Sequence, residues 1–170
     1  MISRVLASVM FLASIVPLSA AAEDSLVRFE GGFGASPVAR DLNPNMALGS
    51  VTPAFYSWVI KDLSVKVKLD GRISVVGRGL LNGGGPNIGT NRGMGQVPIT
   101  VFASLFCLQG STYQEFSTHP PVSVDPNGDF EIEGLLAAVP PAPCDSPVLL
   151  IRNGNQPQFG QWHAAGIPKR

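Results

Sequence analysis

The stretch Leu63-Ser-Val-Lys-Val-Lys-Leu69-Asp-Gly-Arg-Ile-Ser-Val75 contains two short strands and the turn that joins them. Apolar and polar residues alternate from 63 to 69, which is typical of a strand with one buried and one solvent-exposed face. A two-residue turn would pair Val67 with Ser74 and put polar side chains on the buried face. A three-residue loop with Gly71 in the left-handed conformation pairs Val67 with Ile73 instead. The sequence therefore predicts a bulged antiparallel hairpin.

A second turn of the same kind is indicated by Asp125-Pro-Asn-Gly128, which has proline at its second position and glycine where a positive φ is favoured. A three-residue loop at this turn pairs Val124 with Phe130 and Val122 with Ile132 on one buried face. We therefore expect a second bulged hairpin here.

The rest of the chain also favours short strands. With 19 glycines, 15 prolines and only 14% charged residues, the composition indicates many strands and turns. Residues 97–108 are mostly apolar and include Val, Ile, Phe and Thr, which favour a central strand over a helix. Further strands are predicted over 25–33, 55–60, 147–152 and 158–165. About seven to nine such strands predict an all-β, mostly antiparallel β-sandwich, with a closed barrel as the alternative.

The N-terminus has the three parts of a secretory signal peptide. Arg4 supplies a positive charge, residues 5–18 are apolar, and Ala20-Ala-Ala22 fits a cleavage site before Glu23. An uncleaved membrane anchor is the alternative, but the apolar run is shorter than the ~20 residues of a spanning helix. We therefore expect residues 1–22 to be a signal peptide, and 23–170 to be a single exported domain in the periplasm or the medium, without a transmembrane anchor.

The charge balance bears on possible partners. The chain has 12 basic and 12 acidic residues and no basic run. Nucleic acids and anionic membranes are bound through concentrated positive charge. Both are therefore poor candidates as partners, and the identity of any ligand or surface partner is left open.

Two cysteines, Cys107 and Cys144, are predicted to form a disulfide because exported thiols are usually oxidised. The bridge would tie the proline-rich stretch 139–147 to the core. A catalytic thiol is the alternative, and it would need His119 or His163 as its base.

Eight glycines between residues 77 and 95 invite comparison with a phosphate-binding loop. The Gly-Lys-Ser/Thr sequence and the following helix of such a loop are both missing. The stretch therefore predicts a long irregular connection with several positive-φ residues, and a loop over a ligand is the alternative.

Oxygen-bearing side chains at Asp125, Asn127, Asp129 and Glu131 alternate along the second turn and are a candidate cation or ligand loop. The spacing departs from an EF-hand because glycine stands at the fourth position instead of the sixth. The tight turn alone accounts for these residue types, so we predict neither a metal site nor a cofactor.

No catalytic motif is present: the chain lacks Gly-x-Ser-x-Gly and His-Glu-x-x-His. Trp58, Trp162 and His163 are a candidate binding surface, because the two tryptophans with Phe55 and Tyr56 could form a platform that stacks on sugars. The alternative is that these large aromatic side chains belong to the core.

Two resemblances follow from the sequence. The stretches 70–81, 87–90, 144–153 and 162–167 resemble those of small secreted bacterial proteins, which implies export and a common fold but no particular activity. The stretch Val124-Asp-Pro-Asn-Gly-Asp-Phe-Glu-Ile132 is similar to the Asp-x-x-Gly-x-Phe hairpin of prealbumin-like (transthyretin-like) modules. That similarity implies an immunoglobulin-like or prealbumin-like sandwich and a non-catalytic accessory role. After Ile132 the chain departs from the pattern, which leaves the strand order open.

These observations predict a secreted or periplasmic, non-catalytic module that binds a ligand or another surface. The alternative is a small exported hydrolase whose site contains His119 or His163 with a carboxylate or hydroxyl group.

Overall fold

The computed structural model describes residues 24–36, 48, 51–156 and 159–169, and the predicted signal peptide lies outside these residues. The described residues form eleven strands and one short 3₁₀ helix, Met94–Gln96. This part of the chain contains no helix with the length and hydrophobicity needed to cross a membrane. The strands are β1 (Ser25–Gly34), β2 (Trp58–Val59), β3 (Asp62–Lys68), β4 (Arg72–Arg78), β5 (Leu81–Asn82), β6 (Thr100–Gln109), β7 (Thr112–Ser117), β8 (Val122–Ser123), β9 (Phe130–Leu135), β10 (Asp145–Asn153) and β11 (Trp162–Pro168).

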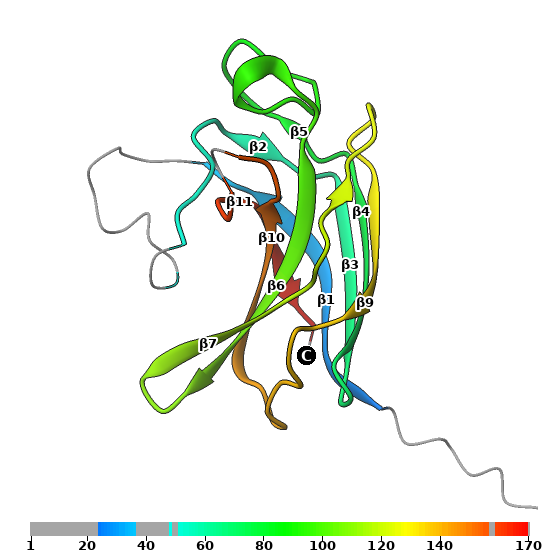
Figure 1. The fold of residues 1–170 in the computed structure, drawn as a ribbon, viewed down its shortest axis with the longest axis vertical. Helices are drawn as coiled ribbons and strands as arrows, with labels where there is room; N and C mark the ends of the chain where they lie inside the picture. Colours follow the sequence, from blue (N-terminus) through cyan, green and yellow to red (C-terminus); the bar gives the residue numbers. More distant parts are fainter. Residues whose placement is uncertain (1–23, 37–47, 49–50, 157–158, 170) are drawn as a thin grey trace, which may run out of the picture.

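One antiparallel sheet dominates the fold. Its strands follow the order β7-β6-β10-β11-β1-β3-β4-β9, and β8 extends it by pairing with β6. In Figure 1 the strands β3, β4 and β9 form one wall, β6 and β10 form the wall opposite, and β1 and β11 connect the two walls. The register shifts within the pairings of β1 and β11, where Gly31 has a φ of +77°. Such bulges bend strands, so the sheet curls into a half-barrel.

The two ends of the curled sheet touch. Thr118, directly after β7, forms an antiparallel bridge with Leu136, directly after β9. Close by, the Ala137 N–H donates a 2.9 Å hydrogen bond to the Ser117 carbonyl oxygen. The two separate facing sheets of a sandwich are therefore not confirmed, because hydrogen bonding continues through β11 and β1 from one wall to the other. The second sheet is only the small pair of β2 and β5.

The first predicted hairpin is confirmed. Val67 of β3 pairs with Ile73 of β4, and Gly71 has a φ of +84°. The bulged loop therefore puts the apolar sets of both strands on one face, and that face is buried.

The second predicted hairpin is wrong in its strand pairing, although its turn is present. Gly128 has a φ of +84°, and its N–H donates to the Asp125 carbonyl oxygen at 3.0 Å. Beyond the turn, Val122 pairs with Val101 of β6 and not with Ile132. Ile132 pairs with Val75 of β4. The two arms of the turn separate because β8 pairs with β6 in one wall of the sheet and β9 pairs with β4 in the opposite wall.

Inward-facing side chains of both walls and of the connecting strands fill the half-barrel. Alternate residues along each strand contribute to this core, as the pleat requires. The largest fully buried side chains of this core are Phe29, Leu63, Ile73, Leu80, Ile99, Leu105, Leu149, Ile151, Val67, Val75 and Val101. A smaller cluster on the outer face of β6, β10 and β11 contains Phe106, Leu150, Ala165, Leu48 and Val51.

The predicted disulfide between Cys107 and Cys144 is present, with a Cα–Cα distance of 5.0 Å. Cys107 is buried in β6, and Cys144 directly precedes β10. Asp145 pairs with Leu108 next to the bridge. The disulfide therefore fixes the end of the proline-rich connection against the core.

The glycine-rich stretch projects from one end of the sheet, above β5 (Figure 1). Three of its glycines, Gly79, Gly85 and Gly89, have positive φ values. Buried Asn82, Asn87 and Asn91 donate side-chain hydrogen bonds to backbone carbonyl groups. The stretch is thus an ordered connection that is held by its own asparagines.

Candidate functional site

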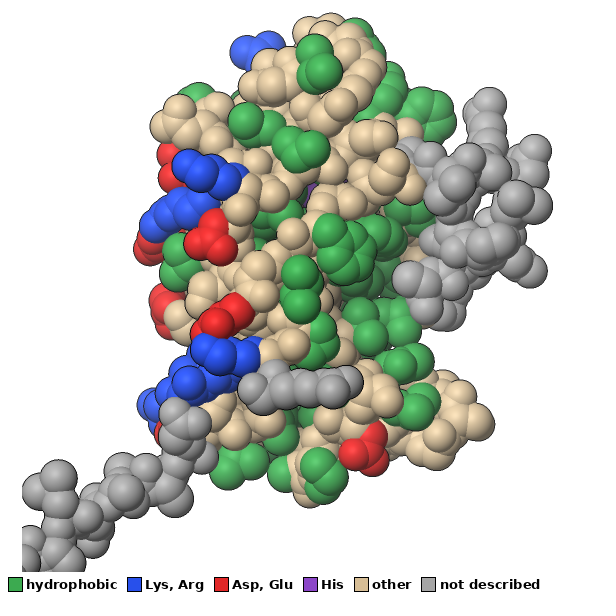
Figure 2. Space-filling view, turned by 180° about the vertical axis from the view of Figure 1, so that it is seen from behind, with side chains coloured by type: hydrophobic (Ala, Val, Ile, Leu, Met, Phe, Trp, Pro, Cys, Tyr) green, Lys and Arg blue, Asp and Glu red, His purple; other side chains and the backbone are tan. Residues whose placement is uncertain are grey.

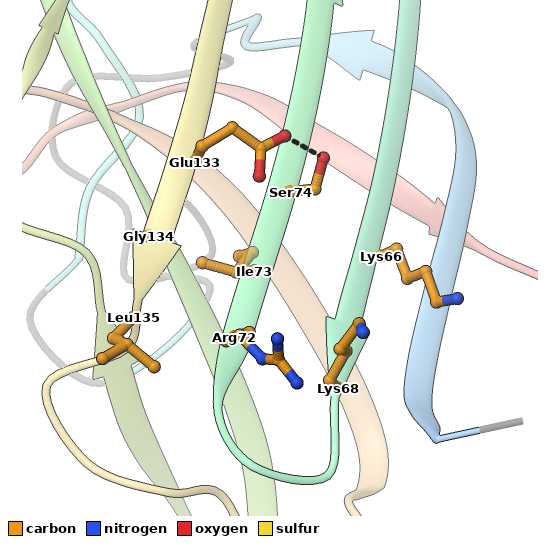
Figure 3. Close-up of a pocket in the computed structure, with 8 residues that line it drawn as sticks. All are labelled: Lys66, Lys68, Arg72, Ile73, Ser74, Glu133, Gly134 and Leu135. Carbon is orange, nitrogen blue, oxygen red and sulfur yellow. Dashed lines mark hydrogen bonds between the residues drawn. The ribbon is translucent and has the colours of Figure 1, made fainter.

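A groove of about 370 Å³ lies on the outer face of β3, β4 and β9 (Figure 3). The alternation of these strands explains its position, because the intervening residues Val65, Val67 and Val75 point into the core. The groove is lined by Lys66, Lys68, Arg72, Ile73, Ser74, Glu133, Gly134 and Leu135. Its lining therefore combines basic, acidic and aliphatic side chains from three neighbouring strands.

Two of the three basic groups in the groove have acidic partners at its rim. Lys68 Nζ lies 3.0 Å from Asp24 Oδ2, and Arg72 Nε lies 2.7 Å from Asp70 Oδ2. The hydrogen bond from Lys68 lowers the pKa of Asp24, and the backbone N–H of Arg72 lowers the pKa of Asp70. Lys66 has no ion-pair partner among residues 24–36, 48, 51–156 and 159–169. The groove therefore offers one unpaired cation and two that are held only by exposed carboxylates.

The middle and the far side of the groove differ from its basic side. Ser74 Oγ donates a hydrogen bond to Glu133 Oε1, which ties β4 to β9 across the groove (Figure 3). Gly134 adds no side chain, and an added Cβ there would meet nothing within 4 Å. Leu135 is 63% exposed beside it. An aliphatic surface and a row of cations thus face the same open depression.

Charged side chains are unevenly distributed over the molecule. Figure 2 shows most of them along one margin of the face in view, whereas hydrophobic side chains gather in its centre. Most of the described ion pairs lie on one side of the sheet. Pairs such as Lys169–Glu30 and Arg78–Glu131 lie on the β1, β3, β4 and β9 side, and Arg152–Glu115 lies on the opposite wall. The groove is part of the charged side.

A second, much smaller recess lies beside His163. It measures about 10 Å³ and is lined by Ala54, Phe55, Tyr56, Trp58, Gly93, Met94, Asn153, Gln161 and His163. His163 occupies a β-bulge, because Trp162 pairs with Arg152 while Ala164 pairs with the adjacent Ile151. Bulges redirect side chains, and this one places His163 in the core with its ring 4.2 Å from that of Trp58.

The imidazole of His163 has an unusual environment. The residue is 2% exposed, and neither Nδ1 nor Nε2 has a hydrogen-bond partner among the residues that the structure describes. Burial lowers its pKa to about 3 because desolvation disfavours the charged ring. The ring is therefore neutral at physiological pH and presents an unshared nitrogen lone pair.

The predicted aromatic surface is only partly assembled. Trp58 and His163 are in contact, but Trp58 is buried. Trp162 lies instead on the outer face of the sheet, where its ring is 6.3 Å from that of Phe33 in an edge-on arrangement. These three residues therefore do not form one open stacking platform.

The second histidine is exposed and stacks on Phe102, with 5.3 Å between the centroids of the two rings. In the described part of the chain, neither His119 nor His163 forms a hydrogen bond with a carboxylate or hydroxyl group. The pairing that a histidine-based hydrolase needs is thus not assembled there.

Carboxylate oxygens of Asp125, Asp129 and Glu131, three of the four candidate loop residues, already have partners within the protein. Asp125 Oδ1 accepts the backbone N–H groups of Asn127 and Asp129. Asp129 Oδ1 accepts the Gly79 N–H at 2.9 Å, and Glu131 lies 2.8 Å from Arg78. No group of three or more His, Cys, Asp or Glu side chains within the described ranges could hold a metal ion.

Comparison with known proteins found no family model that matches the chain, and no curated protein or solved structure similar to it. A function is therefore inferred from the residues and the geometry of this chain alone.

Sequence reasoning did not identify the groove. The alternation in 63–69 does predict that Lys66 and Lys68 point to solvent. The acidic and aliphatic side of the groove depends on β9 lying beside β4, whereas the sequence pairs 130–132 with 122–124. A prediction of this long-range pairing would have been needed to place Glu133 beside Ser74.

Proposed function

We propose that this chain is an exported, non-catalytic binding module and that the groove over β3, β4 and β9 is its ligand site. The observation that carries the proposal is the groove lining, in which exposed Leu135 shares one depression with Lys66, a lysine without an ion-pair partner in the described ranges. Its volume of about 370 Å³ lies within the range of small-molecule sites, roughly 300–1,000 Å³.

The lining favours a small ligand with a carboxylate and an aliphatic part. Lys66 attracts the carboxylate without first losing a partner. Lys68 and Arg72 can exchange their exposed partners for a ligand at little cost, because a surface ion pair is worth about 0–1 kcal/mol. Leu135 and the methylene stems of the lysines offer apolar surface to the rest of the ligand.

Export is part of the same proposal and is supported by the signal-like residues 1–22 and by the disulfide, which forms in oxidising compartments. Mass spectrometry of the protein recovered from periplasm or medium should give a chain that starts at Glu23. A mature chain that retains residues 1–22 in the cytoplasm would contradict export. The finer fold class that we propose is a prealbumin-like sandwich, and it is supported by the turn at 125–128. An experimentally determined strand order would test it.

The binding test uses hexanoate as probe and neutral hexanamide as its matched control. We expect hexanoate to bind with a Kd on the order of 1–10 mM, as ligand efficiency allows for a fragment of this size. Ligand-observed NMR titration should show hexanamide to bind more weakly. Lys66→Gln should weaken hexanoate binding by about three- to fivefold, since one surface ion pair is lost.

The matched variant is Lys61→Gln, which neutralises an exposed lysine outside the groove lining. It should leave the Kd unchanged. Equal binding of hexanoate and hexanamide, or equal loss in both variants, would contradict the proposed site. Turnover of a glycan, peptide or ester that is abolished by His119→Ala would replace the non-catalytic proposal with the hydrolase.

A further inference from the structure

We propose that the recess beside His163 binds a single monovalent soft metal ion, Cu(I), through an imidazole nitrogen of His163 and the thioether sulfur of Met94. This site is separate from the groove, with which it shares no lining residue. The inference therefore does not depend on the ligand site proposed for the groove.

The size of the recess limits what it can hold. Its volume of about 10 Å³ is that of roughly one water molecule. An organic ligand does not fit without rearrangement of the core, whereas one atom or one ion does.

The donor atoms around the recess select a soft cation. Thioether sulfur and neutral imidazole nitrogen are ligands that suit Cu(I), whereas hard divalent ions prefer carboxylates and water. Within the described part of the chain, both nitrogens of His163 are without a hydrogen-bond partner, although the residue is 98% buried.

The charge balance of the recess favours a single positive charge. None of its lining residues is Asp, Glu or Cys, so no anionic ligand could offset the desolvation of a divalent ion. The indole of Trp58, whose ring lies 4.2 Å from that of His163, adds an aromatic face, and such faces attract cations. Phe55 and Tyr56 add aromatic surface to the recess, and the amide side chains of Asn153 and Gln161 also line it. Asn153 Oδ1 already accepts the backbone N–H of Asn155.

The position of His163 in a β-bulge also supports the assignment. An unpartnered polar side chain in a core is costly to retain, and the bulge at His163 aims it there. Such departures from good packing are concentrated at functional sites. Met94 approaches from the far end of the glycine-rich stretch and is 41% exposed, so an ion can reach the recess from solvent on the methionine side.

The test uses Ag(I), a redox-stable monovalent probe, with the disulfide-bonded chain 23–170 in chloride-free buffer. Native mass spectrometry should show one Ag(I) per chain, and tryptophan fluorescence should change on titration because Trp58 borders the site. Met94→Leu and His163→Phe should each weaken binding at least tenfold. Anaerobic competition with bicinchoninate should give the same ranking for Cu(I).

Matched controls are available because the chain beyond residue 22 has one other methionine and one other histidine, Met46 and His119. Met46→Leu, His119→Gln and Lys66→Gln should leave Ag(I) binding unchanged. Unaltered affinity in folded Met94→Leu, loss of binding in His119→Gln, or the absence of a one-to-one complex would each overturn the proposal. Met94→Leu keeps the test informative if His163→Phe does not fold.

Discussion

Replacing His163 with phenylalanine should make the protein markedly less sensitive to mild acid. The folded chain holds this imidazole at a pKa of about 3, whereas the ordinary value is 6.5. Below pH 6.5 the unfolded chain therefore binds a proton that the folded chain does not accept. The contribution of His163 to folding stability is therefore fully present above the unfolded pKa of 6.5. It is lost as the pH falls from there toward the folded pKa of about 3.

The size of the effect follows from the two pKa values. Each pH unit below the unfolded pKa lowers the free energy of unfolding by about 1.36 kcal/mol. Through His163, the free energy of unfolding of the wild-type chain should therefore fall by ~2 kcal/mol between pH 7.5 and 5.0. His163→Phe abolishes this contribution while the other titrating groups stay the same. The variant should also be as stable as the wild type at pH 7.5 or more stable by about 1–2 kcal/mol, because two unsatisfied nitrogens are removed.

Urea unfolding with a chelator present, followed by tryptophan fluorescence at pH 7.5 and 5.0, measures the difference. His119→Gln is the control, because it removes the exposed histidine and leaves the core intact. Identical pH dependence in the wild type and His163→Phe would refute the reasoning. It would mean that the folded protein accepts a proton at His163.

Two further changes test the packing and the covalent link of the fold. Gly77→Ala should destabilise the protein by about 1–3 kcal/mol in urea unfolding, because the added Cβ would lie 2.2 Å from the ring of Phe130. Gly134→Ala, where no atom lies within 4 Å, should be neutral or slightly stabilising, and equal losses in both variants would contradict the packing described. Removing the disulfide with Cys107→Ala and Cys144→Ala should cost roughly 4 kcal/mol, given a sequence separation of 37 residues. An unchanged urea midpoint would show that the bridge does not constrain the chain.

Local patterns in the sequence predict local structure well. The three-residue loop at Gly71 follows from the requirement that both apolar sets share a face, and the structure has that register. Most of the stretch 97–108 lies in the buried strand β6 (Thr100–Gln109), as its β-branched and aromatic composition predicts. The disulfide follows from the count of cysteines in a chain with a signal-like N-terminus.

Long-range pairing could not be predicted in the same way. The turn at Asp125 forms, but β8 joins β6 and β9 joins β4, and these partners are decided by the curl of the whole sheet. β7 is not apparent in the sequence because Phe116 is its only buried residue. The two candidate sites share this limit, because the groove needs β9 beside β4 and the recess needs a bulge at His163.

The most direct test of the groove as a binding site is amide mapping with ¹⁵N-labelled protein. On addition of hexanoate, the largest chemical-shift changes should fall on Lys66, Ser74, Glu133 and Gly134, and Lys66→Gln should reduce them. Changes concentrated at the glycine-rich stretch or around Trp162, with none at these four amides, would contradict the account.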